Sequence, residues 1–149
     1  MSVNVTLVSV EASPTAVVAA TTTWAEFPSL WKPMLDKVWS FLANAPAGLY
    51  KDGHNVMLYK DDLPSVEIGV QVNRPFKGSG DILCSSLPGG QVATARHAGP
   101  IDRIGDTHLA VCAWCAANGY RLRRQRWEIY GDPDPATGEF AVEVFWLVV

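Results

Sequence analysis

The amino-acid sequence predicts an α+β fold made of two β-β-α-β-β-like repeats, related by a pseudo-twofold axis in an antiparallel sheet. Strand patterns of period 2 alternate along the chain with two helical patterns. The sequence of the second half aligns with that of the first at an offset of about 74 residues. A repeat of this length is too long for a solenoid. The chain has 149 residues and is 48% hydrophobic, enough for one core. We therefore expect a single domain, 1–149, with internal repeats at about 3–73 and 81–149.

The first half is expected to form two strands, a helix and a strand pair. Residues 3–11 alternate apolar and polar side chains, and a β-branched strand follows at 16–23, after a turn around Pro14. A helix is predicted over about 29–43, because apolar residues recur there along one helical face. This face consists of Trp31, Leu35, Val38, Trp39 and Leu42. Residues 55–60 and 65–72 then form the expected strand pair.

The second half repeats this order. A Pro-Gly-Gly turn at 88–90 leads into a strand at 91–97, whose polar and apolar side chains alternate. A helix is predicted over 103–117, and the Asn-Gly that follows ends it. Arg126-Trp127-Glu128-Ile129-Tyr130 then has a strand pattern, in which a carboxylate is flanked by aromatic side chains.

Short segments of the two halves match each other. Residues 58–61 (LYKD) align with 129–132 (IYGD), and the Val-Glu of 66–67 recurs near the C-terminus. Ala19 falls on Ala93 in the same alignment. The offset drifts by a few residues between these matches, so gaps are needed.

Composition and charge exclude several classes of protein. The net charge of −3 argues against a nucleic-acid partner, which usually meets a basic face. Arg121, Arg123, Arg124 and Arg126 cluster, but we interpret them as a solvated strand end. No apolar run approaches the ~20 residues of a membrane span, and no signal peptide is recognisable, so a cytoplasmic protein is expected. The 3 cysteines do not suit a disulfide framework, and buried thiols are expected.

Neither a metal nor a cofactor is expected. His97 and His108 fall on different predicted elements and lack the spacing of a metal-binding helix. The Gly-Ser-Gly at 78–80 precedes a strand rather than a helix, so it does not form a phosphate-binding loop. Ser85 and Ser86 lack the surroundings of a hydrolase nucleophile.

Several motifs, taken in their order and spacing, resemble the GyrI-like family. They are LPGGxVA, HxGPxD, Asn-Gly, WExYxDP and a final VEV strand. The resemblance is densest over 87–149 and departs from the family at Ile101, where Tyr is frequent. It implies two helices on one face of the sheet and a cleft between the halves. The family includes effector-binding domains of multidrug-sensing bacterial regulators, in which a DNA-binding domain is fused to them. Because the sequence has no such domain ahead of Val3, no direct DNA binding is expected.

Glu128 is the first candidate for a functional residue. Period 2 places Arg126 and Tyr130 on its face of the strand. In an aromatic cleft, Glu128 would be a partly desolvated carboxylate that attracts cations, and aromatic faces would add about 0.5–2 kcal/mol. The resemblance implies the same role, because related domains bind lipophilic cations with a Glu in the matching strand. The alternative is a surface Glu paired with Arg126 or with a cross-strand Arg.

The aromatic residues supply the other candidates. The chain has 6 Trp, and flat rings can clasp planar ligands, although each ring could equally belong to the core. The family also places an aromatic side chain at the pocket mouth, where Tyr50 falls. The expected ligand-binding set is Glu128, Tyr50, Trp39, Trp31, Tyr130 and Trp146. Glu67 or Glu143 could add a second pocket carboxylate for acid–base chemistry, but alternation equally permits both to face solvent.

Three functions remain open at this point. The first is a stand-alone small-molecule-binding protein, a monomer or weak dimer, for hydrophobic, planar or cationic ligands. The second follows from the resemblance: some stand-alone GyrI-like proteins hydrolyse cyclopropane-bearing, DNA-alkylating natural products, and Glu128 would then be the catalytic base. The third is a protein-interaction role, such as the gyrase inhibition that gave the family its name.

Overall fold

The computed structural model describes residues 3–149, so the first two residues of the expected 1–149 domain lie outside it. The described residues form one sheet of eight strands, two α-helices and a short 3-10 helix. In chain order these are β1 (Thr6–Val10), β2 (Ser13–Thr21), α1 (Phe27–Ala43), β3 (Lys51–Tyr59), β4 (Ser65–Val72), β5 (Leu83–Leu87), β6 (Gly90–His97), η1 (Ile101–Arg103), α2 (Ile104–Ala117), β7 (Leu122–Pro133) and β8 (Phe140–Val148).

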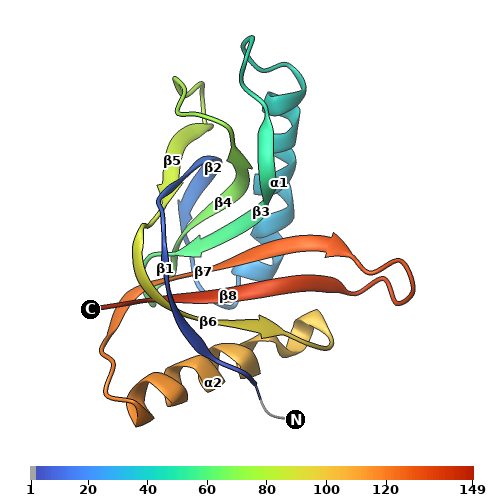
Figure 1. Ribbon diagram of the computed structural model, residues 1–149. Coiled ribbons are helices and arrows are strands. Elements are labelled where there is room, and N and C mark those ends of the chain that lie inside the picture. The colour runs from blue at the N-terminus through green and yellow to red at the C-terminus, as the bar shows by residue number, and fades with distance from the viewer. Residues whose placement is uncertain (1–2) are drawn as a thin grey trace.

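The sheet confirms the predicted fold class. Its strand order is β1-β6-β8-β7-β3-β4-β2-β5, and every neighbouring pair is antiparallel. Each half contributes its elements in the order β-β-α-β-β, and β3 and β7 meet at the centre of the sheet. The halves also exchange their first strands, because β1 pairs with β6 and β5 pairs with β2. Figure 1 shows the two helices toward opposite ends of the sheet.

Two details of the predicted strand layout are wrong. The turn predicted around Pro14 belongs instead to β2, because Ser13 and Pro14 pair with the end of β5. The alignment of Ala19 with Ala93 is also shifted. Ala19 lies opposite Glu67, whereas the equivalent glutamate of β8 lies opposite Arg96. Arg96, rather than Ala93, is therefore the structural counterpart of Ala19.

Both helices pack on the same face of the sheet. Met57 of β3, Glu128 of β7 and Val144 of β8 lie side by side in register and share that face. Met57 belongs to the core cluster that contains the buried α1 residues, and Val144 belongs to the cluster that contains those of α2. Glu128 therefore lies on the helix-covered face, at the junction of the two halves.

The opposite face of the sheet has its own apolar core. Trp127, 1% exposed, stacks on Phe145 with the ring centroids 5.6 Å apart. The β1–β2 and β5–β6 connections come together at this side, where Glu11 and Pro88 border one cavity with Trp127. Strand alternation places Trp127 in this core, so its neighbour Glu128 must point toward the helices.

Candidate functional site

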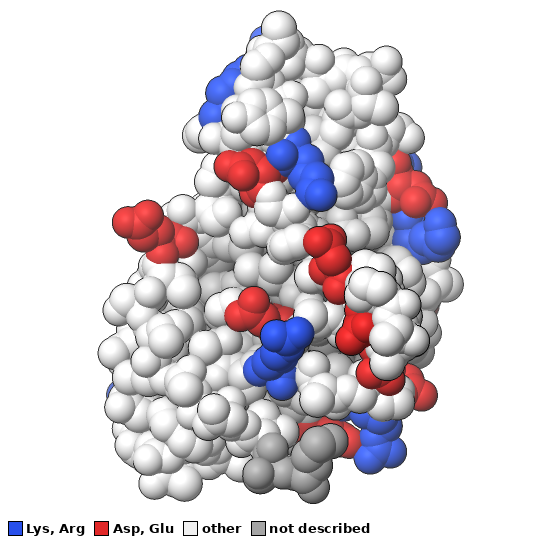
Figure 2. Space-filling view, turned by 45° about the vertical axis from the view of Figure 1, so that its right-hand side comes forward, with Lys and Arg blue, Asp and Glu red and all other residues white. Residues whose placement is uncertain are grey.

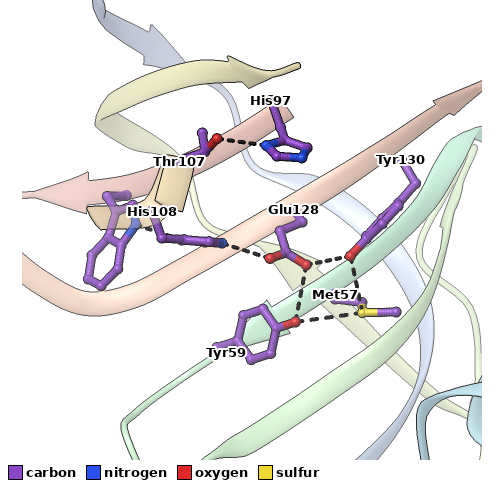
Figure 3. Close-up of polar contacts among 8 residues, drawn as sticks. Met57, Tyr59, His97, Thr107, His108, Glu128 and Tyr130 are labelled. Carbon is purple, nitrogen blue, oxygen red and sulfur yellow. Dashed lines mark hydrogen bonds and ion pairs between the residues drawn. The ribbon is translucent and has the colours of Figure 1, made fainter. Parts of the chain in front are cut away.

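Glu128 lies on the helix-covered face and is 2% exposed. Its Oε1 accepts hydrogen bonds from the hydroxyls of Tyr59, at 3.1 Å, and Tyr130, at 2.6 Å. Figure 3 shows both phenols converging on the carboxylate from neighbouring strands. The alternative interpretation, a surface Glu paired with an arginine, is wrong, because the side chain is buried and its partners are of other kinds.

His108 of α2 provides the third contact. Its Nε2 lies 2.7 Å from Oε2 of Glu128, and its Nδ1 lies 2.9 Å from the indole Nε1 of Trp146. An indole N–H can only donate, so Nδ1 of His108 must accept, and the imidazole proton is on Nε2. His108 is therefore a neutral donor to Glu128 in this arrangement.

The site consequently keeps a buried negative charge. The three groups that donate to Glu128 are two phenols and a neutral imidazole, and none of them carries a positive charge. Burial raises the pKa of Tyr59 and of Tyr130, and the negative charge on Glu128 raises both further. Both phenols therefore keep the protons that they donate. The carboxylate is hydrogen-bonded but not neutralised by these contacts.

Arg126 lies beside this carboxylate in an aromatic cage, formed by Trp24, Tyr59 and Trp146. The register places Arg126 between Tyr59 of β3 and Trp146 of β8. Its Cζ lies 5.0 Å from the ring centroid of Trp146 and 5.9 Å from those of Trp24 and Tyr59. Its Nη1 donates to Oδ1 of Asp62 at 2.8 Å. The interpretation of the arginine cluster as a solvated strand end is therefore wrong for Arg126, whose side chain fills the cage.

The surface between the two helices is hollowed on the face that Figure 2 shows. Acidic and basic side chains are interspersed around the hollow. The first repeat, with α1, forms the upper part of this face, and the second, with α2, forms the lower part. This arrangement is the one that the resemblance to ligand-binding domains implied.

The family model of the GyrI-like small molecule binding domain matches residues 4–149. The chain belongs to this family. No curated protein matches it.

Solved structures share the fold of this GyrI-like domain. The C-terminal domain of EcmrR superposes with a TM-score of 0.83 at 21% identity, covering 100% of this chain and 99% of that one. SAV2435 bound to tetraphenylphosphonium gives a TM-score of 0.71 at 14% identity, covering 98% and 94%. A hydrolase encoded by lin2189 from Listeria innocua gives 0.62 at 10% identity, covering 97% and 91%. These identities establish a common fold and nothing more.

The GyrI-like domain brings some of the expected ligand-binding residues together. Tyr130 contacts Glu128 directly, and Trp146 reaches it through His108. Trp39 of α1 is 38% exposed and donates to Oδ1 of Asn55 at 3.0 Å. Because Asn55 lies opposite Tyr130 in the sheet, Trp39 borders the site at the end away from the cage.

Trp31 and Tyr50 lie elsewhere in the GyrI-like domain. Trp31 packs against the core beneath α1. Tyr50 is 61% exposed and lies between α1 and β3. Among the described residues, the polar and ring contacts do not link either side chain to Glu128. Their predicted roles as ligand contacts remain predictions.

The hypothesis of a second pocket carboxylate is wrong, because strand alternation puts both candidates on the other face. Glu67 lies opposite Leu58, whose side chain belongs to the core around Trp127. It is buried, and it pairs with Lys60 and Ser85. Glu143 lies opposite Ile129 and is exposed. Only Glu143 faces solvent, and neither carboxylate can act together with Glu128.

The sequence prediction missed Tyr59, Trp24 and the role of His108. A signal for Tyr59 was present, because the internal alignment places it on Tyr130. His108 was considered only with His97, whose ring instead joins Thr107 to the carbonyl of Pro100. Within the described part of the chain, His, Cys, Asp and Glu side chains do not gather into a metal-binding group. Neither helix of residues 3–149 is long and apolar enough to cross a membrane.

Proposed function

We propose that this GyrI-like domain binds hydrophobic, planar ligands, cationic ones above all, with Glu128 as the partner of the positive charge. One observation carries the proposal: a buried carboxylate accepts three hydrogen bonds, and all three come from uncharged donors. A ligand cation beside Glu128 would gain a charge–charge interaction in a poorly solvated site, where screening is weak.

The surrounding aromatic side chains suit the apolar part of such a ligand. Trp39 and Trp146 border the two ends of the site and are both partly exposed. Flat rings stack on planar ligands and lose little conformational entropy on binding. The structural neighbour SAV2435, bound to tetraphenylphosphonium, supports a lipophilic cation as the ligand class.

Substituting Glu128 tests the proposal. We expect Glu128→Gln to weaken the binding of a planar cationic dye by roughly 1–3 kcal/mol, the cost of losing a charge-assisted partner. Saturable quenching of Trp fluorescence measures the affinity of the dye. Glu143→Gln is the matched control, because Glu143 is exposed on the neighbouring strand and faces away from the site. Equal affinity of wild type and Glu128→Gln would show that Glu128 does not recognise the cation.

Hydrolysis of a cyclopropane-bearing, DNA-alkylating compound is the alternative. It is favoured by the free acceptor position on Glu128, because the donors fill three of the roughly four lone-pair positions of a carboxylate. A water molecule at the fourth position could give its proton to Glu128 and attack a carbon of the strained ring. A ring C–C bond then breaks, its electron pair passes to the leaving carbon, and the proton held by Glu128 can return to that side of the product.

We expect binding without turnover, and a second experiment checks this. A planar compound with a strained three-membered ring is incubated with the protein, and mass spectrometry follows the water adduct. The leading proposal predicts adduct formation at the buffer rate in wild type, with saturable binding of the compound. Faster adduct formation in wild type that Glu128→Gln abolishes would establish the hydrolase instead.

A further inference from the structure

The aromatic cage already holds a cation, and that cation belongs to the chain itself. The guanidinium of Arg126 contacts the rings of Trp24, Tyr59 and Trp146. Cations over aromatic faces gain about 0.5–1 kcal/mol at exposed sites and about 2 or more when desolvated. The Arg126 side chain is 9% exposed, so its contacts with the rings belong to the desolvated, stronger kind.

The cage and the carboxylate form one continuous site, because two residues take part in both. Tyr59 presents its ring to Arg126 and its hydroxyl to Glu128. Trp146 presents its ring to Arg126 and its N–H to His108, which in turn donates to Glu128. A ligand cation held by Glu128 would therefore be a close neighbour of the Arg126 guanidinium.

Arg126 is tied to the edge of the site rather than to Glu128. Its Nη1 donates to Asp62, whose side chain is 85% exposed, and to the backbone carbonyl oxygen of Arg124. Trp24 reaches the same loop, because its indole N–H donates to the carbonyl oxygen of Asp62. Because the Asp62 side chain is exposed, it can follow a moving guanidinium and keep the ion pair.

The closed arrangement leaves the carboxylate inaccessible. Glu128 is 2% exposed, Tyr59 is 6% exposed and Arg126 is 8% exposed. A planar ligand cannot lie on the rings of the cage while the guanidinium occupies it. Of the side chains in and around the cage, Arg126 has the longest flexible stem, so it is the group that can move out of it.

We propose that Arg126 determines specificity as a resident cation, which a ligand must displace toward solvent, together with its partner Asp62, before it can occupy the aromatic cage beside Glu128. This inference rests on the proposed function. It adds that the Arg126 guanidinium competes with the ligand for the aromatic cage. The displaced guanidinium stays near the site, so its positive charge penalises ligands with a second charge. Ligands with one delocalised positive charge and a large flat surface gain most from the rings and lose least to this repulsion.

The test compares ethidium, a planar monocation, with neutral phenanthridine on wild type, Arg126→Ala and Arg126→Met. Both substitutions remove the competing charge, and methionine retains an apolar stem that packs in the cage. We expect ethidium to bind about tenfold more tightly to both variants, because a like charge is removed from a poorly solvated site. The affinity for phenanthridine should rise less, because a neutral ligand benefits only from the space that the arginine side chain leaves. Arg123→Ala, which removes an exposed charge from the same strand, should change ethidium binding less than about twofold, as expected for screened surface charges.

Glu128→Gln in each background separates the two proposals. The proposal for Arg126 is supported if ethidium binds more tightly to the Arg126 variants and if adding Glu128→Gln abolishes that gain in affinity. If Glu128→Gln weakens ethidium binding but Arg126→Met, folded as judged by thermal unfolding, does not tighten it, the Arg126 proposal alone fails. If Glu128→Gln has no effect in either background, the proposed function fails. Equal gains for ethidium and phenanthridine would reduce Arg126 to a steric obstacle and overturn its role as a competing cation.

Discussion

Replacing Gly69 with alanine is expected to destabilise the fold by at least about 3 kcal/mol, the upper part of the range for overpacked cores. Gly69 lies in β4, directly opposite Val17 of β2. A Cβ on Gly69 would lie 1.8 Å from the carbonyl oxygen of Ala16 and 2.8 Å from the Cα of Val17. Both contacts are with backbone atoms of a paired strand, so no side-chain rotation can relieve them.

Urea unfolding of Gly69→Ala and wild type measures this effect, with the shift of the midpoint as readout. Gly105→Ala is the control, because a Cβ on Gly105 of α2 meets nothing within 4 Å. That substitution should instead stabilise the protein by up to about 1 kcal/mol, the difference in helix propensity. An unchanged midpoint for Gly69→Ala would contradict the close approach of β2 and β4.

The stability of the protein is expected to fall steeply above about pH 10, because Tyr59 and Tyr130 must stay protonated in the fold. Burial and the charge on Glu128 raise the pKa of both phenols, while an unfolded chain has tyrosines with a pKa of about 10. Above that pH the unfolded state binds fewer protons than the folded state, so stability declines as pH rises. Each tyrosine contributes about 1.4 kcal/mol per pH unit between its two pKa values.

The free energy of unfolding, measured in urea at several pH values above neutrality, checks this dependence. Below about pH 10 the two tyrosines should not change the free energy of unfolding. Above that pH the free energy should decline with a slope that is the sum of their two contributions. The variant Tyr59→Phe with Tyr130→Phe should start less stable, because Glu128 loses two donors, and should show a shallower alkaline decline. Tyrosinate absorbance of both residues at about pH 10 in a protein that remains folded would contradict the prediction.

The sequence by itself determined the order of the elements and the face on which Glu128 lies. The strand at 65–72 has the predicted bounds, and α2 ends just before Asn118-Gly119, as the stop signal indicated. Period 2 correctly placed Tyr130 on the same face as Glu128. These features depend only on the spacing of residues within one helix or strand. The hydrophobic pattern and the turn residues of the sequence show that spacing directly.

Only the tertiary structure decided which residues surround Glu128. His108 lies in α2 and Tyr59 in the first repeat, so neither is near Glu128 in sequence. Their contacts follow from the pairing of β3 with β7 and from the packing of α2 on β6 and β8. Arg126 illustrates the same limit. Its sequence neighbours suggested a solvated charge, while rings from two other strands and from the segment before α1 bury it.

The physical reason is that a pattern within a strand or helix fixes which side chains share a face, but not what lies across from that face. Strand register and helix docking set those neighbours, and they result from burying the whole apolar surface at once. Glu67 and Glu128 show the outcome, because both are glutamates between apolar neighbours in central strands. Packing puts Glu67 beside Lys60, a charged partner, and surrounds Glu128 with neutral donors.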